Sequence, residues 1–103
     1  MGIEEITGKE AIEAVKNGSV FVDVREDHEV ADTAYDIEGG MHIPLGDIPA
    51  RASELPKDKE IIVGCRSGAR SMNACMYLNG EGYKVKNLQG GIMGWMDNGL
   101  PTK

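Results

Sequence analysis

Short apolar runs rich in β-branched residues alternate along this chain with segments of helical pattern. Two such runs, at residues 19–24 and 60–64, are predicted to be strands. A final strand is predicted at residues 84–88, where Val85 and Leu88 stand among polar residues. Alternation of strands and helices is typical of a sheet whose strands run mostly parallel, with the helices packed against it. We therefore expect an α/β fold with a mostly parallel central sheet and helices on both of its faces.

Helix signals separate the predicted strands. The first is a capping box, in which Thr7 is followed three residues later by Glu10, and the helix is predicted to stop at Asn17-Gly18. Further helical patterns cover 26–31, 45–55 (weakly), 67–79 and a short stretch around Trp95 that follows Gly90-Gly91, whereas 32–40 and 56–59 are predicted to be loop and turn.

Two of the predicted strands end in residues that carry chemistry. Asp23-Val24-Arg25 ends the first run, and Cys65 directly follows the second. In open α/β sheets, ligands bind beyond the carboxyl ends of the strands. The functional site is therefore predicted at the edge of the sheet where these residues meet.

Size and charge limit the classes of partner. A chain of 103 residues suits one domain, spanning 1–103, with one core. It carries 17 acidic against 11 basic residues, a net charge of −6, which disfavours nucleic acid and anionic membranes as partners. The basic residues near Cys65 are a local exception, and they favour a small anion as ligand.

The two cysteines, Cys65 and Cys75, are too few for a disulfide framework, and a bridge between them is not expected. No apolar run approaches the length of a membrane span, and the acidic N-terminus does not resemble a signal peptide. A reducing, cytoplasmic setting is the default expectation.

The sequence C-R-S-G-A-R-S at residues 65–71 places one cysteine between a predicted buried strand and a predicted helix. A thiol is a strong nucleophile only as thiolate, and helix N-termini and nearby cations stabilise that anion. The backbone amides of 67–71, with Arg66 and Arg70 beside them, are expected to lower the pKa of Cys65.

An alternative is that Cys65 is an inert core residue, because free cysteines are among the most buried residue types. Two arginines within five residues are not expected beside an inert core cysteine, so the reactive interpretation is favoured. Cys75, inside the predicted helix, is expected to belong to the core. Met41, Met93, Trp95 and Met96 are open to two interpretations, as the rim of a pocket or as core filling.

Five segments together resemble the rhodanese (sulfurtransferase) family, specifically its small single-domain members. They are V-D-V-R-E at 22–26, H-I-P-L-G-D-I at 42–48, E-L-P-K-D-K at 54–59, C-R-S-G-A-R-S at 65–71 and N-L-Q-G-G-I-M-G-W at 87–95. The chain departs from the family where a histidine-containing stretch is replaced by residues 35–40. His42 stands where asparagine is common, and we expect it to be a structural residue.

The resemblance implies a persulfide relay. Cys65 would be the catalytic residue, accepting a sulfur atom from a donor such as thiosulfate and passing it to cyanide or a thiol. The donor would be a small anion, with a protein thiol as a further candidate acceptor, and no metal or organic cofactor is needed. The substrate-binding loop would comprise Arg66, Ser67, Gly68, Ala69, Arg70 and Ser71. Asp23 and Arg25 are expected to support the loop rather than to contact substrate.

Two other functions remain open. One is a persulfide carrier that serves a partner protein, for which the same loop would suffice. The other is a cysteine phosphatase or arsenate reductase, which would need a C-x5-R loop, whereas Cys65 and Arg70 form C-x4-R. The shorter loop makes a smaller cradle, better suited to a sulfur atom than to a phosphoryl group.

Overall fold

Five strands and five helices follow one another in the computed structural model, which describes residues 2–103. Their order is β1 (Glu5–Ile6), α1 (Gly8–Lys16), β2 (Val20–Asp23), α2 (Asp27–Asp32), β3 (Met41–His42), α3 (Ile48–Arg51), β4 (Glu60–Gly64), α4 (Ala69–Gly80), β5 (Lys84–Leu88) and α5 (Gly91–Asp97). Single 3₁₀ turns, Leu45–Asp47 and Ala52–Glu54, flank α3. Within residues 2–103, no helix combines the length and the apolar character that a membrane crossing requires.

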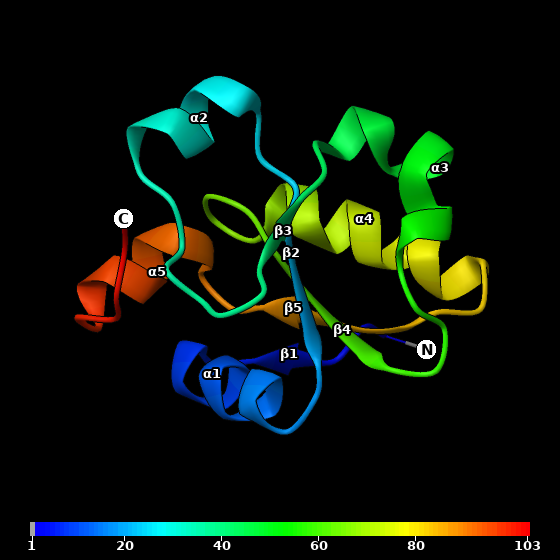
Figure 1. The fold of residues 1–103 in the computed structure, drawn as a ribbon, viewed down its shortest axis with the longest axis horizontal. Helices are drawn as coiled ribbons and strands as arrows, with labels where there is room; N and C mark the ends of the chain where they lie inside the picture. The colour runs from blue at the N-terminus through cyan, green and yellow to red at the C-terminus, as the bar shows by residue number, and fades with distance from the viewer. Residues whose placement is uncertain (1) are drawn as a thin grey trace.

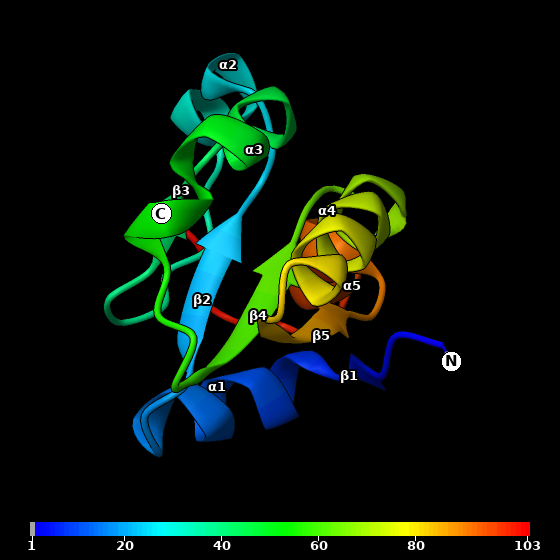
Figure 2. The same cartoon turned by 90° about the vertical axis from the view of Figure 1, so that its right-hand side faces the viewer.

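The strands form one sheet in the order β1-β5-β4-β2-β3, and every pairing in it is parallel. Helices α3 and α4 cover one face and α1 and α5 the other (Figure 1). The sheet twists strongly from β1 to β2, and α2 stands beyond the end of β2 (Figure 2). These features confirm the predicted α/β fold with a mostly parallel sheet and helices on both faces.

The two halves of the core follow from the alternation of side chains along β4. Ile61 and Val63 point to the face covered by α3 and α4, whereas Ile62 points to the face covered by α1 and α5. The alternation continues one residue past the strand, so the side chain of Cys65 lies on the same face as Ile61 and Val63, the face covered by α4. The strand therefore directs the cysteine toward the start of the next helix.

The strand ends meet as predicted. In the register between β2 and β4, Asp23 lies opposite Gly64. Arg25 and Cys65 each follow their strand within two residues, so both stand at the same edge of the sheet. The chemistry-bearing residues are thus gathered there by topology alone.

Two local predictions were wrong, and two short strands were missed. The two-residue strands β1 and β3 were not expected, because each gains its pairing from a distant partner and is too short to show a period. The segment 45–55 is broken into separate turns rather than one helix. Helix α4 begins at Ala69 and not at residue 67, because Gly68 has a left-handed φ of 109° that a helix does not allow.

Candidate functional site

The backbone of Cys65 is held from two sides. Its carbonyl oxygen accepts a hydrogen bond from the Tyr35 hydroxyl, with an oxygen–oxygen distance of 2.5 Å. It also accepts one from the backbone N–H of Ile92 in α5, at 2.8 Å. Because one bond comes from before and the other from after Cys65 in the sequence, the cysteine has a fixed place at the end of β4.

The sulfur of Cys65 lies under the loop that leads to α4, and in Figure 1 this loop passes between α2 and α5. The backbone N–H of Gly68 donates to Sγ at 3.0 Å, and the Ser71 hydroxyl oxygen is 3.3 Å from Sγ. The left-handed Gly68 turns the loop so that its amide faces the sulfur. The loop thus supplies hydrogen-bond donors to a residue that is only 1 % exposed.

The pKa of the Cys65 thiol is lowered from its ordinary value. Burial is the largest single influence and raises this pKa, because it penalises the charged thiolate. The hydrogen bonds from the Ser71 hydroxyl and from the backbone amides of Ser71, Gly68 and Ser67 together outweigh that penalty. The thiolate is therefore stabilised mainly by hydroxyl and amide donors.

Ser71 belongs to a buried chain of hydrogen bonds that sequence reasoning missed. The Asn87 side chain presents Oδ1 to the Ser71 hydroxyl at 2.5 Å. Its Nδ2 donates to Glu5 Oε2 at 2.9 Å and to the Gly68 carbonyl at 3.1 Å, so both amide hydrogens are engaged. Asn87 therefore acts only as an acceptor toward Ser71, and it competes with the Cys65 sulfur for one hydroxyl proton.

The two loop arginines differ in their surroundings. Arg70 forms a two-pronged ion pair with Glu29 of α2, with Nη1–Oε1 and Nη2–Oε2 distances of 2.6 and 2.8 Å. Its hydrogen bonds hold the pKa of Glu29 at about 2, against the opposing effect of burial. Arg66 is exposed and forms no ion pair with residues 2–103. Arg66 is thus the loop cation whose charge is not already balanced.

Asp23 and Arg25 hold each other at the end of β2. Arg25 Nη2 lies 2.8 Å from Asp23 Oδ2 and also 2.8 Å from the Thr33 carbonyl oxygen. The guanidinium lies over the ring of Tyr35, 5.5 Å from its centroid. Since Tyr35 in turn binds the Cys65 carbonyl, this buried pair is connected to the loop through one side chain. His42 Nε2 lies 2.6 Å from the Arg25 carbonyl oxygen, so its ring contacts the backbone just beyond the end of β2.

The start of α5 packs tightly against the loop backbone. Gly91 has a φ of 57°, and a Cβ there would collide with the Arg66 carbonyl group. The N–H of Met93 donates to the Arg66 carbonyl at 3.1 Å. Gly91 is therefore required by a close approach of two backbones, and Gly90 by its left-handed φ of 78°, reasons that the sequence alone does not reveal.

A cleft of about 580 Å³ opens beside the loop, between α2 and α5. Arg66, Glu29 and Asp32 give it charge, while Met93 and Met96, each 46 % exposed, give it apolar surface. These two methionines thus line a cleft. Trp95, by contrast, is buried in the core beneath α5.

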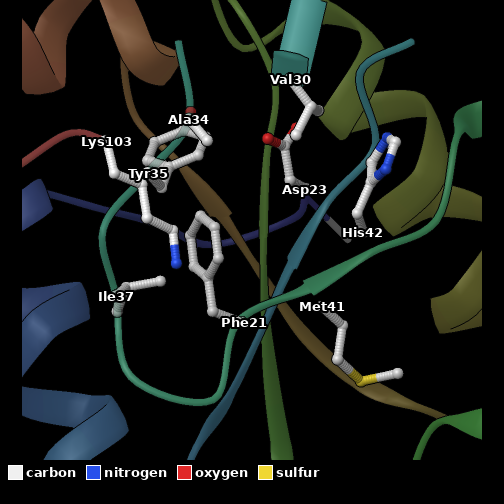
Figure 3. Close-up of a pocket in the computed structure, with 10 residues that line it drawn as sticks. Phe21, Asp23, Val30, Ala34, Tyr35, Ile37, Met41, His42 and Lys103 are labelled. Atoms are coloured by element: carbon white, nitrogen blue, oxygen red, sulfur yellow. The ribbon is translucent and has the colours of Figure 1, made fainter. Parts of the chain in front are cut away.

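A second, smaller cavity of about 110 Å³ lies beside β2 and β3. Figure 3 shows Phe21, Tyr35 and Ile37 on one side of it and Asp23 and His42 on the other. The Asp23 carboxylate there is already engaged by Arg25. Residues 2–103 contain no cluster of three or more histidine, cysteine or acidic side chains placed to hold a metal ion. The candidate reactive site is therefore the loop of residues 65–71 together with the cleft beside it.

Known proteins resemble this chain over most of its length. The family model "Rhodanese-like domain" matches residues 7–98. A Bacillus subtilis protein named "Putative sulfurtransferase YtwF" is 48 % identical over 98 residues, which cover 92 % of each chain. A second protein of that species, "Putative sulfur carrier protein YrkF", is 41 % identical over 76 residues, covering 73 % of this chain and 40 % of the relative.

The fold comparison agrees. The crystal structure of a rhodanese-related protein from Thermoplasma volcanium superposes with a TM-score of 0.87 at 28 % identity, covering 97 % of both chains. Taken together, the relatives support sulfur transfer as the general class of activity, and a transferase as the class of enzyme. On its sequence motifs, its fold and the match over residues 7–98, the chain belongs to the rhodanese-like domain family.

Proposed function

We propose that this protein is a sulfurtransferase in which Cys65 carries the transferred sulfur as a persulfide. The Cys65 thiolate attacks the outer sulfur of a donor such as thiosulfate, forming a new S–S bond. The bond between the two donor sulfurs breaks, and its electron pair leaves with sulfite. A thiophilic acceptor, cyanide or a thiol, then takes the outer sulfur and returns Cys65 to the thiolate.

The observation that carries this proposal is the set of donors around Sγ. Gly68 and Ser71 hydrogen-bond to the sulfur, and the pKa of Cys65 is lowered in spite of its burial. The same amides are suited to stabilise the negative charge of the persulfide. Arg66 and Arg70 are assigned to the attraction of an anionic donor, and Asp23 and Arg25 to support of the loop.

Intact-mass measurement tests the proposal. Incubation with thiosulfate should add about 32 Da, the mass of one sulfur, and cyanide should remove it. Cys65→Ser should abolish the addition, while the matched variant Cys75→Ser should retain it. Absence of the added mass with thiosulfate and with organic donors alike, or its persistence in Cys65→Ser, would contradict the proposal.

A second candidate is a carrier that delivers persulfide to one partner protein. It is favoured by the relative named a sulfur carrier protein, and the chain matches 40 % of that relative's length. A carrier would show slow turnover with thiosulfate and cyanide but rapid, stoichiometric transfer to a specific protein thiol. Fast multiple turnover with small molecules alone would show that the protein is an enzyme and not a carrier.

A further inference from the structure

We propose that Glu29 is a specificity-determining residue that disfavours doubly charged inorganic donors relative to singly charged organic ones. This inference rests on the proposed function and concerns the choice of donor at the same site. It starts from the ion pair between Glu29 and Arg70, in which two hydrogen bonds join α2 to the loop of residues 65–71.

The pair places a fixed negative charge where an anionic donor has to arrive. Arg70 is the last basic residue of the loop, and Glu29 already occupies both of its terminal nitrogens. The side chains are 35 % and 19 % exposed, so the pair is within reach of a small anion from solvent. A donor that binds Arg70 has to share it with a carboxylate or displace that carboxylate.

The counter-charge is present at every physiological pH. The hydrogen bonds from Arg70 hold the pKa of Glu29 at about 2, so the carboxylate stays ionised throughout the neutral range. Repulsion between Glu29 and a donor grows with the donor's charge, and it is larger for a dianion than for a monoanion. The unbalanced charge of Arg66 is sufficient to attract a single negative charge.

The neighbouring cleft favours a donor with an organic part. Its volume of about 580 Å³ is far larger than thiosulfate needs, and Arg66, Met93 and Met96 all line it. Methionine side chains adapt readily to apolar groups of different shape. A monoanion with an apolar body can therefore place its charge near Arg66 and its carbon atoms against Met93 and Met96.

Two sulfur donors that differ in charge but react in the same way test the inference. Thiosulfate is a dianion and benzenethiosulfonate a monoanion, and each gives one sulfur to a thiolate. In each case the S–S bond of the donor breaks, and its electron pair leaves with sulfite or with benzenesulfinate. The measured quantity is kcat/KM for each donor with cyanide as acceptor, in the wild type and in Glu29→Gln.

Glu29→Gln is a conservative change for the fold. Glu29 Oε1 accepts the backbone N–H of Glu26 at the start of α2, at 3.0 Å. The glutamine side chain has a carbonyl oxygen that can keep this bond. Asp32→Asn is the matched control, because it removes one negative charge from the same cleft but from a residue that does not bind Arg70.

The expected result is a rise of about two- to five-fold in kcat/KM for thiosulfate in Glu29→Gln, the size typical of a solvent-accessible ion pair. The value for benzenethiosulfonate should change less, and the gain for thiosulfate should shrink with added salt. Asp32→Asn should alter the ratio of the two values less than Glu29→Gln does.

An unchanged ratio in Glu29→Gln, or an equal change in Asp32→Asn, would overturn the inference. Either result leaves the proposed function intact as long as both donors add sulfur to Cys65 in the wild type. Failure of both donors to add sulfur would instead contradict the proposed function itself.

Discussion

The two cysteines of this protein are equally buried and chemically opposite. Cys65 is 1 % exposed and Cys75, in the middle of α4, is 0 % exposed. Hydrogen bonds from the loop lower the pKa of Cys65, whereas burial raises the pKa of Cys75 to about 12. The comparison shows that burial does not decide whether a thiol is reactive, because the donors around the sulfur set the free energy of the thiolate.

The largest expected effect is a difference in alkylation between these two thiols. At pH 7.5, iodoacetamide should modify Cys65 at least about a hundred times faster than Cys75, because only the thiolate reacts. Peptide mapping by mass spectrometry after timed quenching measures both rates in one sample. The same experiment in denaturant is the control, where the two rates should converge. Similar rates in the native protein would remove the distinction between the two sites.

The next largest effect is expected from Ser71→Ala, which removes the hydroxyl donor to the Cys65 sulfur. A hydrogen bond to a charged group is worth about 1.5–3 kcal/mol, so the pKa of Cys65 should rise by roughly one to two units. Sulfur transfer below that pKa should fall about ten-fold or more and recover toward high pH. Ser71→Thr keeps the hydroxyl and should retain the wild-type pH profile. A uniform loss at all pH values would indicate structural damage instead.

Asn87→Ala is expected to act on Cys65 in the opposite direction. Asn87 Oδ1, at 2.5 Å, is the nearest of three acceptors around the Ser71 hydroxyl; the Gly68 carbonyl lies at 3.2 Å and the Cys65 sulfur at 3.3 Å. Removal of Asn87 Oδ1 therefore makes the proton more available to the thiolate. The pKa of Cys65 should fall by less than about one unit, while the loss of a buried amide should cost about 1–3 kcal/mol of stability. A pH–rate profile and urea unfolding separate the two effects. A rise of the pKa in this variant would show that Asn87 supports the thiolate and does not compete with it.

The smallest effect expected is in the alkaline dependence of stability. Cys75 has a folded-state pKa of about 12, above its unfolded value, so the native state binds the proton more tightly. The contribution of Cys75 to the free energy of unfolding is present below the pKa of the unfolded state. It is lost as pH rises above that pKa, by up to about 1.4 kcal/mol per pH unit. Cys65 contributes in the opposite sense, because its folded-state pKa is lowered.

Urea unfolding between pH 8 and 10 measures this slope. Cys75→Ala should lose less stability over that range than the wild type, whatever its stability at pH 8. Cys65→Ala should lose at least as much as the wild type. Equal slopes in all three proteins would mean that neither thiol differs in pKa between the folded and unfolded states.

The sequence predicted what depends on local pattern. The apolar run 60–64 and the motif of residues 65–71 identified the strand and the candidate nucleophile, and the parallel sheet followed from their alternation with helices. Cys75 was correctly expected in the core. The left-handed Gly68 was not foreseen, so the start of α4 was placed two residues too early.

What the sequence missed are contacts between residues that are far apart in the chain. Ser71 and Asn87 are 16 residues apart, Glu29 and Arg70 are 41, and Glu5 and Asn87 are 82. No local periodicity encodes such pairs. Backbone amides were expected to stabilise the thiolate together with Arg66 and Arg70. The amides do lower the pKa of Cys65, but the leading donor is the Ser71 hydroxyl, and Arg70 is paired with Glu29. Only the folded arrangement shows which charges are already balanced.

The central claim is that the hydrogen-bond donors of the loop lower the pKa of the Cys65 thiol in spite of its burial. Its most direct test is the pH profile of iodoacetamide alkylation at Cys65, measured in Cys75→Ser so that one thiol reports alone. We predict an apparent pKa below that of a free cysteine, which is about 8.5. A value equal to or above that of a free cysteine would contradict it.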